Sequence, residues 1–387
     1  MRSLWLTCLI ALLAVACRDA TPTAPDEVSV PLFKPKCDTP PCKDDGGEDP
    51  PPPPPPSTVE AHILFSSGME GNEGGGGCKR GDLGTSMYRM DLSGNYERVF
   101  PDELETQAFT SEPSLAPDGQ RFVMYRDVYT VAKGRCATEN FQIVTAAVDG
   151  TDFQVIADFE RGTSISTIVG EPEWSPVAVG GSERIAWRQW TDGVNSIVTA
   201  STDGTGAVPL ITGTSTEQLW GFAWSRTGDQ MLVYFEQQSQ LASLRLHSVT
   251  CGSTCSASAA INVADLSPIP PDAWLQFQMD WAHLSDRVLV SACVAGDCDV
   301  YGIDLTDPLS PAVTQYTARP GGADELEPRW SPDDTKILFM TGVDGSEWLV
   351  ELDLTVASLP WSGDFSAPGV RLLAETRIFG GADWRSF

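Results

Sequence analysis

Few residues in this chain have obvious catalytic or metal-binding potential. The three histidines, His62, His247 and His283, are far apart in the sequence. His247, Cys251 and Cys255 follow one another at intervals of four residues, and such a trio can hold zinc when its side chains converge. The stretch has the pattern of a β-hairpin in an exported protein, however, so we favour a local disulfide between the two cysteines over a metal site.

Familiar catalytic and nucleotide-binding motifs are also missing. The sequence has neither the Gly-x-Ser-x-Gly elbow of serine hydrolases nor the Ser-x-Asp-x-Gly-x-Thr-Trp box of sialidases. The glycine run from Gly74 to Gly77 is not followed by a helical pattern, so it does not form a phosphate-binding loop. The 53 acidic residues outnumber the 25 basic residues, and the net charge of −28 disfavours nucleic acid and favours basic or cationic ligands.

The cysteines indicate a protein that is stapled by disulfides. Cys8 lies in the N-terminal targeting segment and Cys17 is the predicted lipidation site, so eight of the ten cysteines remain for pairing. Short spacing pairs Cys37 with Cys42, Cys251 with Cys255, and Cys293 with Cys298. This leaves Cys78 and Cys136, which we predict to bond between two neighbouring repeats of the chain.

The N-terminus is predicted to direct export. Arg2 is followed by the apolar run Leu4 to Ala16, which is too short to be a stable membrane span and is typical of a signal peptide, residues 1–16. The stretch from Leu13 to Cys17 resembles a bacterial lipobox, in which the cysteine is acylated. Ala14-Val-Ala16 also fits ordinary signal cleavage, so plain secretion is the alternative.

Residues 17–60 read as a lipidated, disordered tether. The segment is polar and proline-rich without periodicity, and Pro50 to Pro56 form a stiff spacer of roughly 20 Å. The alternative for the proline run is a ligand for a partner's aromatic groove. Arg18 stands where many inner-membrane lipoproteins have aspartate, so we expect anchoring in the outer membrane, facing the periplasm or the cell surface.

Residues 61–387 contain a repeat. The best copy, Glu327 to Met340, reads as a strand that ends at Trp330, a Ser-Pro-Asp-Asp turn and a second strand. Copies recur along the chain, and we call the residue at the Trp330 position the anchor of each copy. The anchors are Leu115, Trp174, Trp224, Trp281, Trp330 and Trp384, which are about 50 to 60 residues apart. Such a long period in a chain of short strands predicts propeller blades.

The two ends of this region predict how the ring closes. The first strands, from His62 onwards, have no anchor strand before them, and the last anchor strand, Gly381 to Phe387, has nothing after it. Joining the two completes one blade and removes a free sheet edge. The predicted fold class is therefore all-β: a six-bladed β-propeller with four antiparallel strands per blade, closed by pairing the N- and C-terminal strands.

The repeat resembles a known family at this point. Pro-x-Trp-Ser-Pro-Asp followed by Ile-x-Phe is similar to the TolB-like propeller repeat, a relative of the WD-repeat blade. Glu112 to Tyr125, Glu171 to Trp187 and Glu327 to Met340 carry the resemblance best. It implies the propeller fold but no particular function.

A candidate ligand site follows from the loop lengths. The turns after the first and third strands of each blade are tight, so we expect recognition on the opposite face, where the chain approaches each anchor strand. These approaches bring together acidic and aromatic residues: Glu112, Glu171, Glu327, Phe109, Trp220, Trp274 and Phe379. Acids around a concave mouth favour a cationic ligand. The alternative is that the aromatic residues pack under the blades and the glutamates are simply solvated.

Two function classes fit the sequence. We favour a membrane-anchored, non-catalytic scaffold of the cell envelope that presents a propeller face to a protein, peptide or glycan. The alternative is an exported enzyme of the lyase or lactonase type that uses a metal in the central channel. No cofactor is expected, although a cation bound in the channel is compatible with the acidic residues.

Overall fold

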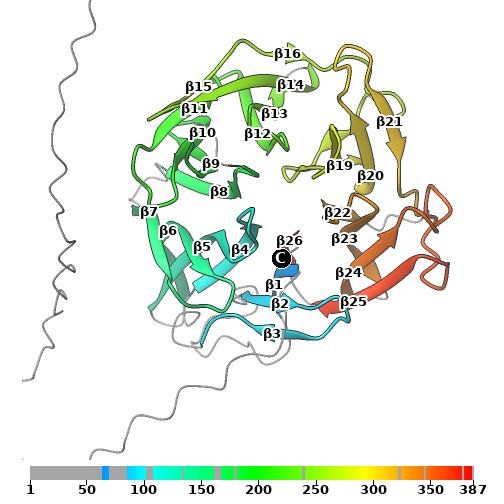
Figure 1. The fold of residues 1–387 in the computed structure, drawn as a ribbon, viewed down its shortest axis with the longest axis horizontal. Coiled ribbons are helices and arrows are strands. Elements are labelled where there is room, and N and C mark those ends of the chain that lie inside the picture. The colour runs from blue at the N-terminus through cyan, green and yellow to red at the C-terminus, as the bar shows by residue number, and fades with distance from the viewer. Residues whose placement is uncertain are drawn as a thin grey trace, which may run out of the picture. The chain divides into compact units, whose positions relative to one another are not determined.

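Six β-sheets form a ring around a central channel (Figure 1). The computed structural model describes residues 63–68, 85–101, 108–132, 135–160, 167–177, 181–237, 240–320, 324–343, 346–376 and 379–385. In these residues there is no α-helix, and consequently no helix that is long and apolar enough to cross a membrane. The predicted all-β, six-bladed propeller is confirmed. The signal peptide and the proline-rich tether lie outside the described residues.

Each blade is an antiparallel sheet, written here from the channel outwards. Blade 1 contains β26 (Phe379–Trp384), β1 (Ile63–Ser67), β2 (Ser86–Met90) and β3 (Tyr96–Arg98); blade 2 contains β4 (Ala108–Leu115), β5 (Arg121–Ala132), β6 (Arg135–Ala147) and β7 (Gln154–Glu160); blade 3 contains β8 (Thr167–Trp174), β9 (Arg184–Thr191), β10 (Val194–Ser201) and β11 (Val208–Thr212).

In the next two blades, one of the four strand positions is divided between two short strands. Blade 4 contains β12 (Glu217–Trp224), β13 (Gln230–Gln237), β14 (Gln240–Cys251) and an outer position shared by β15 (Cys255–Ala257) and β16 (Ile261–Asn262); blade 5 contains an inner position shared by β17 (Trp274–Leu275) and β18 (Asp280–Trp281), then β19 (Arg287–Val294), β20 (Asp297–Asp304) and β21 (Ala312–Gln315); blade 6 contains β22 (Glu325–Trp330), β23 (Lys336–Val343), β24 (Ser346–Asp353) and β25 (Val370–Thr376).

The turn after each inner strand forms for local reasons. In blade 6 the Ser331 hydroxyl accepts a hydrogen bond from the Lys336 N–H at 2.9 Å, and the Asp333 carboxylate accepts one from the Thr335 N–H at 3.2 Å. These bonds satisfy backbone donors that the tight turn leaves without a strand partner. Asp334 does more than the predicted turn formation, because its carboxylate accepts the N–H of His283 at 2.8 Å in blade 5.

The ring closes as predicted. Strand β26 pairs antiparallel with β1, placing Trp384 opposite Ile63, so the last strand of the chain is the innermost strand of the first blade. Figure 1 shows the C-terminus at the channel beside β1. The closure pairs the inner edge of β1, which would otherwise be the exposed edge of a three-stranded blade.

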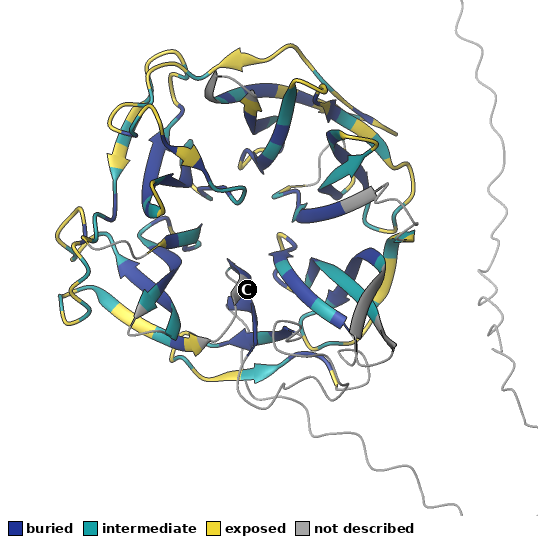
Figure 2. Ribbon diagram, turned by 180° about the vertical axis from the view of Figure 1, so that it is seen from behind, coloured by how far each residue is buried: buried dark blue, intermediate teal, exposed yellow. Residues whose placement is uncertain are grey.

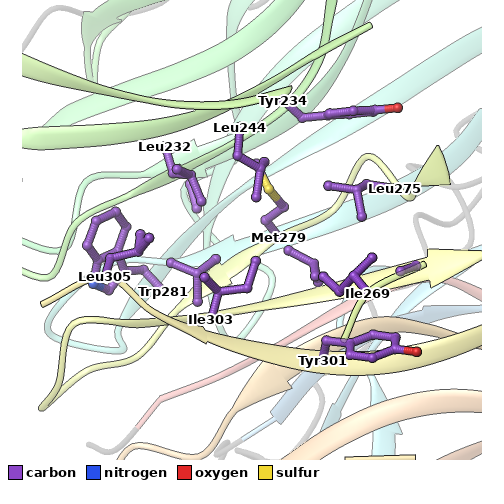
Figure 3. Packing of buried hydrophobic residues seen from close by; sticks show 14 of the residues in the cluster. Leu232, Tyr234, Leu244, Ile269, Leu275, Met279, Trp281, Tyr301, Ile303 and Leu305 are labelled. Carbon is purple, nitrogen blue, oxygen red and sulfur yellow. The ribbon is translucent and has the colours of Figure 1, made fainter. Parts of the chain in front are cut away.

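The hydrophobic core lies between the blades. Each anchor residue packs in a cluster with residues of the preceding blade; Trp330, for example, lies with Ala282 and Leu289 of blade 5. The five anchor tryptophans are at most 5% exposed, so their rings are part of the packing between blades. Figure 3 shows the cluster between blades 4 and 5, where Trp281 and Met279 meet Leu232 and Leu244. Burial decreases outwards, and the outer strands carry most of the exposed positions (Figure 2).

The outer strand of blade 1, β3, follows a tight turn. The Asp91 carboxylate accepts hydrogen bonds from the N–H groups of Ser93 and Asn95, both at 2.9 Å, and so closes the turn that leads into Tyr96.

Two of the predicted disulfides are present. Cys251–Cys255 joins β14 to β15, and Cys293–Cys298 joins β19 to β20. The sulfurs of Cys251 and Cys255 are bonded to each other, so they are not ligands of a metal beside His247. The predicted pairs Cys78–Cys136 and Cys37–Cys42 concern side chains outside the described residues.

Ring closure predicts a large effect of Trp384→Ala. Trp384 is 4% exposed and lies in the seam between blades 6 and 1. The substitution is expected to lower the free energy of unfolding by about 3–5 kcal/mol, because a buried aromatic side chain is lost. The matched control is Trp274→Ala at a tryptophan that is 43% exposed, which should lose a small part of that amount in the same urea titration. Equal losses at the two positions would contradict the role given to the closing strand.

Candidate functional site

Two positions of the inner strands face the channel in every blade. We call the residue directly before each anchor the clasp position and the residue three before the anchor the bulge position. The clasp residues are Ser114, Glu173, Ala223, Asp280, Arg329 and Asp383, and the bulge residues are Glu112, Glu171, Gly221, Gln278, Glu327 and Gly381. Because strand side chains alternate, the clasp side chain points away from the anchor side chain, towards the channel.

The clasp residues hold neighbouring blades together. Ser114 accepts a hydrogen bond from the N–H of Trp174 in the next blade at 3.0 Å. Glu173, Asp280 and Asp383 likewise accept a hydrogen bond from the anchor N–H of the next blade, which is blade 4, blade 6 and blade 2, respectively. The donor–acceptor distances are 3.3, 2.6 and 2.6 Å. Four of the six seams thus use a side-chain oxygen to satisfy a buried backbone donor.

The other two seams depart from this pattern. Ala223 has no side-chain acceptor for the seam between blades 4 and 5. Arg329 reverses the direction of bonding, because its Nε donates to the Ala382 carbonyl of blade 1 at 2.8 Å. The Arg329 guanidinium also lies near the channel carboxylates, including Glu173 and Asp280, whose negative charge it partly offsets.

The bulge residues are held in an unusual backbone conformation. Glu112, Glu171 and Glu327 have φ angles of 56°, 51° and 54°, a region that favours glycine, and Gly381 has 99°. In all three glutamate-bearing strands, the pairing register shifts at this position. The bulge adds a residue to the inner strand and turns the glutamate towards the channel.

The three glutamates are close together and are not simply solvated. Glu112 accepts a hydrogen bond from the Glu171 N–H, and Glu171 forms an ion pair with Arg188 at 2.9 Å. One carboxylate oxygen of Glu171 and one of Glu327 are buried without a hydrogen-bond partner in the described part of the chain. A small cavity of about 10 Å³ lies between Glu112, Glu171, Gln278 and Arg329, which is about the room that one water needs.

Burial sets the protonation of these acids. It raises the pKa of Glu171 to about 7, with the Glu112 charge adding to the effect and Arg188 opposing it. It raises the pKa of Glu327 to about 8 and that of Asp280 to about 6. Burial also raises the pKa of Glu173 well above its ordinary value. The channel therefore carries less negative charge at neutral pH than its composition suggests.

A cavity of about 330 Å³ opens beside the clasp residues. It lies on the face of the ring that carries the turn after the innermost strand of each blade, which we call the face of the first turns. All six blades contribute to its lining. Its walls include Trp174, Trp224 and Trp281, and its rim includes Pro117, Pro176, Pro332, Val177 and Leu284. This size lies at the lower end of the range of small-ligand pockets and suits one or two side chains.

The polar part of this cavity contains charges of both signs. Burial lowers the pKa of His283 to about 4, and the charge of Arg385 adds to this shift, so His283 is neutral at neutral pH. One of its ring nitrogens accepts a hydrogen bond from Arg385. Arg385 also lies 3.7 Å from the Asp383 carboxylate. The described residues contain no group of three His, Cys, Asp or Glu side chains placed to share one metal ion.

The predicted ligand-binding residues occupy several different environments. Glu112, Glu171 and Glu327 lie together in the channel. Trp220 stacks on Phe277 with ring centroids 5.2 Å apart, and Arg188 lies over both rings. Phe109 is half-buried on β4, while Trp274 is 43% exposed on β17. Phe379 lies on β26, but its side chain is outside the described residues. Their binding role stays a prediction.

Sequence reasoning missed the clasp residues and Arg385. The sequence does contain a signal for the clasp residues, since a polar residue stands directly before the anchor in five of six copies. A polar side chain next to a buried tryptophan on the same strand must face the opposite side, which in an inner strand is the channel.

Comparison with known proteins supports the fold. No protein-family model and no curated protein matches the sequence. The structure is similar to TolB from Acinetobacter baumannii, with 11% identity, 85% of this chain and 67% of that chain covered, and a TM-score of 0.56. A nidogen/laminin complex scores 0.49 with 11% identity, covering 84% of this chain and 98% of that chain. Oligogalacturonate lyase in complex with manganese scores 0.44 with 13% identity, covering 68% and 70%.

These likenesses concern the fold alone, because the identities are low. The chain has the six-bladed β-propeller fold that the sequence pattern predicted, and this fold is similar to that of TolB.

The clasp bonds predict the effect of Ser114→Ala. The change leaves the buried Trp174 N–H without an acceptor, and we expect a loss of about 1–3 kcal/mol in the free energy of unfolding. Ser196→Ala is the matched control, because the Ser196 hydroxyl bonds only an exposed Thr212 hydroxyl. Thermal unfolding of both variants would measure the difference, and an unchanged melting temperature for Ser114→Ala would argue against the clasp.

The raised glutamate pKa values predict a fall in stability between pH 6.5 and 8. The folded state keeps protons on Glu171 and Glu327 up to about pH 7 and 8, whereas the unfolded state releases them near the ordinary value of 4.5. The unfolded state binds fewer protons in this window, so the free energy of unfolding decreases as the pH rises. Below pH 6.5 the lowered pKa of His283 acts in the opposite direction, which is why the window starts there.

Melting temperatures across this range would test the expectation. The Glu171→Gln, Glu327→Gln double variant should show a flatter profile than the unmodified protein. A melting temperature that rises from pH 6.5 to 8 in the unmodified protein would show that other groups dominate.

Proposed function

We propose that the protein is a non-catalytic binding scaffold of the cell envelope, which takes a segment of a partner protein or peptide into the 330 Å³ cavity. The observation that carries the proposal is the convergence of all six blades on this one cavity. A segment that enters it contacts residues from the whole ring, so its position is fixed from every side.

The lining of the cavity suits recognition of a polypeptide. Pro117, Pro176 and Pro332 provide rigid apolar surface at the rim. Trp174, Trp224 and Trp281 also belong to the lining, but they are at most 5% exposed because they pack between the blades. At the rim, Val177 is 39% exposed and Leu284 is 68% exposed. Exposed apolar side chains around a concave site are a usual mark of a binding surface.

The acidic side chains that line the cavity support a binding role rather than a catalytic one. Glu173, Asp280 and Asp383 each accept a backbone N–H from the next blade, which ties them to the scaffold. The alternative, an enzyme with a metal in the channel, requires several ligands that converge on one ion. The described residues do not present such a set in their present arrangement.

Attachment to the envelope is part of the proposal. It rests on the sequence of residues 1–60, with acylation at Cys17 followed by the proline-rich tether. The two disulfides of the propeller are typical of an exported protein, because they persist in oxidising compartments.

The cavity rim gives a direct test. The full-length chain and its Val177→Ser, Leu284→Ser variant would each be immobilised and used to capture proteins from an envelope extract. We expect the variant to recover the partner roughly tenfold less, since two exposed apolar contacts are lost at the rim.

The matched control is Leu309→Ser, Val356→Ser, which removes exposed apolar side chains that do not line the cavity. It should recover the partner as well as the unmodified chain does. Equal recovery by the rim variant, or a stoichiometric metal ion in the purified protein together with turnover of an envelope polymer, would overturn the scaffold proposal.

A further inference from the structure

The turns that follow the inner strands place aspartates beside the cavity. Asp118 and Asp333 directly follow prolines of the cavity lining, and Asp229 stands three residues after Arg226, which also belongs to the lining. All three aspartates are exposed to solvent. We call Asp118, Asp229 and Asp333 the rim acids.

Each rim acid has a carboxylate oxygen that a partner can reach. The Oδ1 atom of Asp118 accepts the N–H of Gln120 at 2.9 Å, and the Oδ1 atom of Asp333 accepts the N–H of Thr335 at 3.2 Å. Asp229 also uses its Oδ1 atom, which accepts two hydroxyls of its own turn. The three Oδ2 atoms accept no hydrogen bond from the described part of the chain, and they belong to exposed side chains.

The basic residues that follow the inner strands on this face are already paired with other acids. Among the described residues these are Arg226, which lies 3.3 Å from the Asp286 carboxylate, and Arg385, which lies 3.7 Å from the Asp383 carboxylate. Neither of them forms an ion pair with a rim acid.

The basic residues at the far ends of the same turns are also engaged elsewhere. Arg121, which begins the second strand of blade 2, pairs with Asp152 at 2.9 Å, and Lys336, which begins that of blade 6, pairs with Glu351 at 3.0 Å. In blade 4 the second strand begins with the uncharged Gln230. The rim acids are therefore left without a positive partner in the part of the chain that the structure describes.

The negative surface extends outwards from the rim. Asp149 and Asp203 lie in the turns between the third and fourth strands of blades 2 and 3, which are on the same face. Side-chain hydrogen bonds from threonines of these turns lower the pKa of both residues, and one from a serine lowers the pKa of Asp333. These carboxylates stay charged at neutral pH, so they attract basic groups towards the cavity.

The interior of the cavity favours an apolar occupant. Arg329 and Arg385 belong to its lining, so a lysine or arginine that entered would lose its water beside two like charges. Acids of the lining such as Asp280 are already bonded to backbone N–H groups. An apolar side chain meets neither cost, and it gains contact with Val177 and Leu284 at the rim.

Charge disfavours two occupants that the chain itself could supply. Residues 17–60 contain nine acidic and four basic residues, so the rim acids repel the predicted tether. A second copy of the protein, with its own net charge of −28, is repelled as well. The surface therefore suits a different protein that carries the opposite charge.

We propose that the cavity takes an apolar side chain of a partner segment in which lysine or arginine residues flank that side chain and pair with the rim acids. The inference rests on the proposed scaffold function and adds the chemistry of the partner to it. It places the recognition of basic groups on the face of the first turns, opposite the face that the loop lengths suggested. The rim acids guide the approach of the segment, and the apolar contact holds it.

The variant Asp118→Asn, Asp229→Asn, Asp333→Asn tests the charge of the rim. Asparagine keeps the Oδ1 acceptor of each turn, so the melting temperature should not change. The probe is a capped peptide in which two lysines stand on each side of one leucine. We expect calorimetry at low ionic strength to show about tenfold weaker binding by the variant, because three exposed charge pairs are lost. The difference should shrink at high salt.

The matched charge control is Glu160→Gln, Asp192→Asn, Asp272→Asn. It removes the same charge at three exposed positions outside the face of the first turns. Its affinity for the lysine peptide should stay within about twofold of that of the unmodified chain. Equal losses in the control and in the rim-acid variant would overturn the proposal, since net charge alone would then explain the binding.

Two further peptides separate this proposal from the scaffold function. One carries glutamines in place of the lysines, and the other carries glycine in place of the leucine. Both should bind about tenfold more weakly than the lysine–leucine peptide. The Val177→Ser, Leu284→Ser variant should weaken binding of both leucine peptides.

The outcomes differ for the two proposals. If the glutamine and lysine peptides bind equally and the Val177→Ser, Leu284→Ser variant weakens both, the cavity binds segments but the basic specificity is overturned. The specificity is also overturned if the glycine peptide binds as tightly as the leucine peptide, or if no peptide binds. Capture of a partner from the envelope extract tests the scaffold function in either case.

Discussion

The structure depends on the hydrogen bond that ties the backbone N–H of one anchor residue to the clasp side chain of the preceding blade. A propeller packs separate sheets face to face, so no backbone ladder runs from one blade to the next. The donor of Trp174, for example, would be buried without a partner if Ser114 did not accept it. The anchor packing and the clasp bond occur at adjacent residues, so four of the six seams are fixed by apolar contact and by a directed bond together.

This arrangement gathers charge where the blades meet. Asp280, Asp383 and Glu173 are buried because they serve as acceptors, and Arg329 reaches across them to the Ala382 carbonyl. Burial raises the pKa of Asp280 to about 6 and that of Glu173 well above its ordinary value, which lowers the negative charge of the channel at neutral pH. Their role in holding the ring and their unusual protonation therefore have one cause, which is that the clasp positions lie at the crowded centre of the ring.

The cavity lies on the face of the ring that carries the turns after the inner strands. Exposed apolar side chains such as Val177 and Leu284 stand at its rim, and charged side chains such as Asp280 and Arg329 form part of its lining. The cavity therefore offers apolar contact and charged groups at one place in the ring.

The sequence by itself determined the blades and their closure. The Ser-Pro-Asp turn of blade 6 is set by residues a few positions apart, such as Ser331 and Lys336, and less exact copies of the same strand–turn–strand pattern marked the other blades. The unmatched strands at the two ends, near Ile63 and Trp384, predicted how the ring closes. The pairing of Cys293 with Cys298 followed from their short separation. These features are local, or repeat a local pattern, and so they can be read along the chain.

Only the tertiary structure decided which residues meet at the centre and at the seams. Glu112 and Glu171 are 59 residues apart, yet one accepts a hydrogen bond from the other. Whether they were solvated or buried depended on the bulge that turns them into the channel, and a bulge is a property of paired strands. Asp299 and Glu325 likewise come together because two blades pack side by side. The sequence does not show which acids are neighbours in space. The packing of the blades decides this, and the neighbours determine the protonation and the hydrogen-bond partners of each acid.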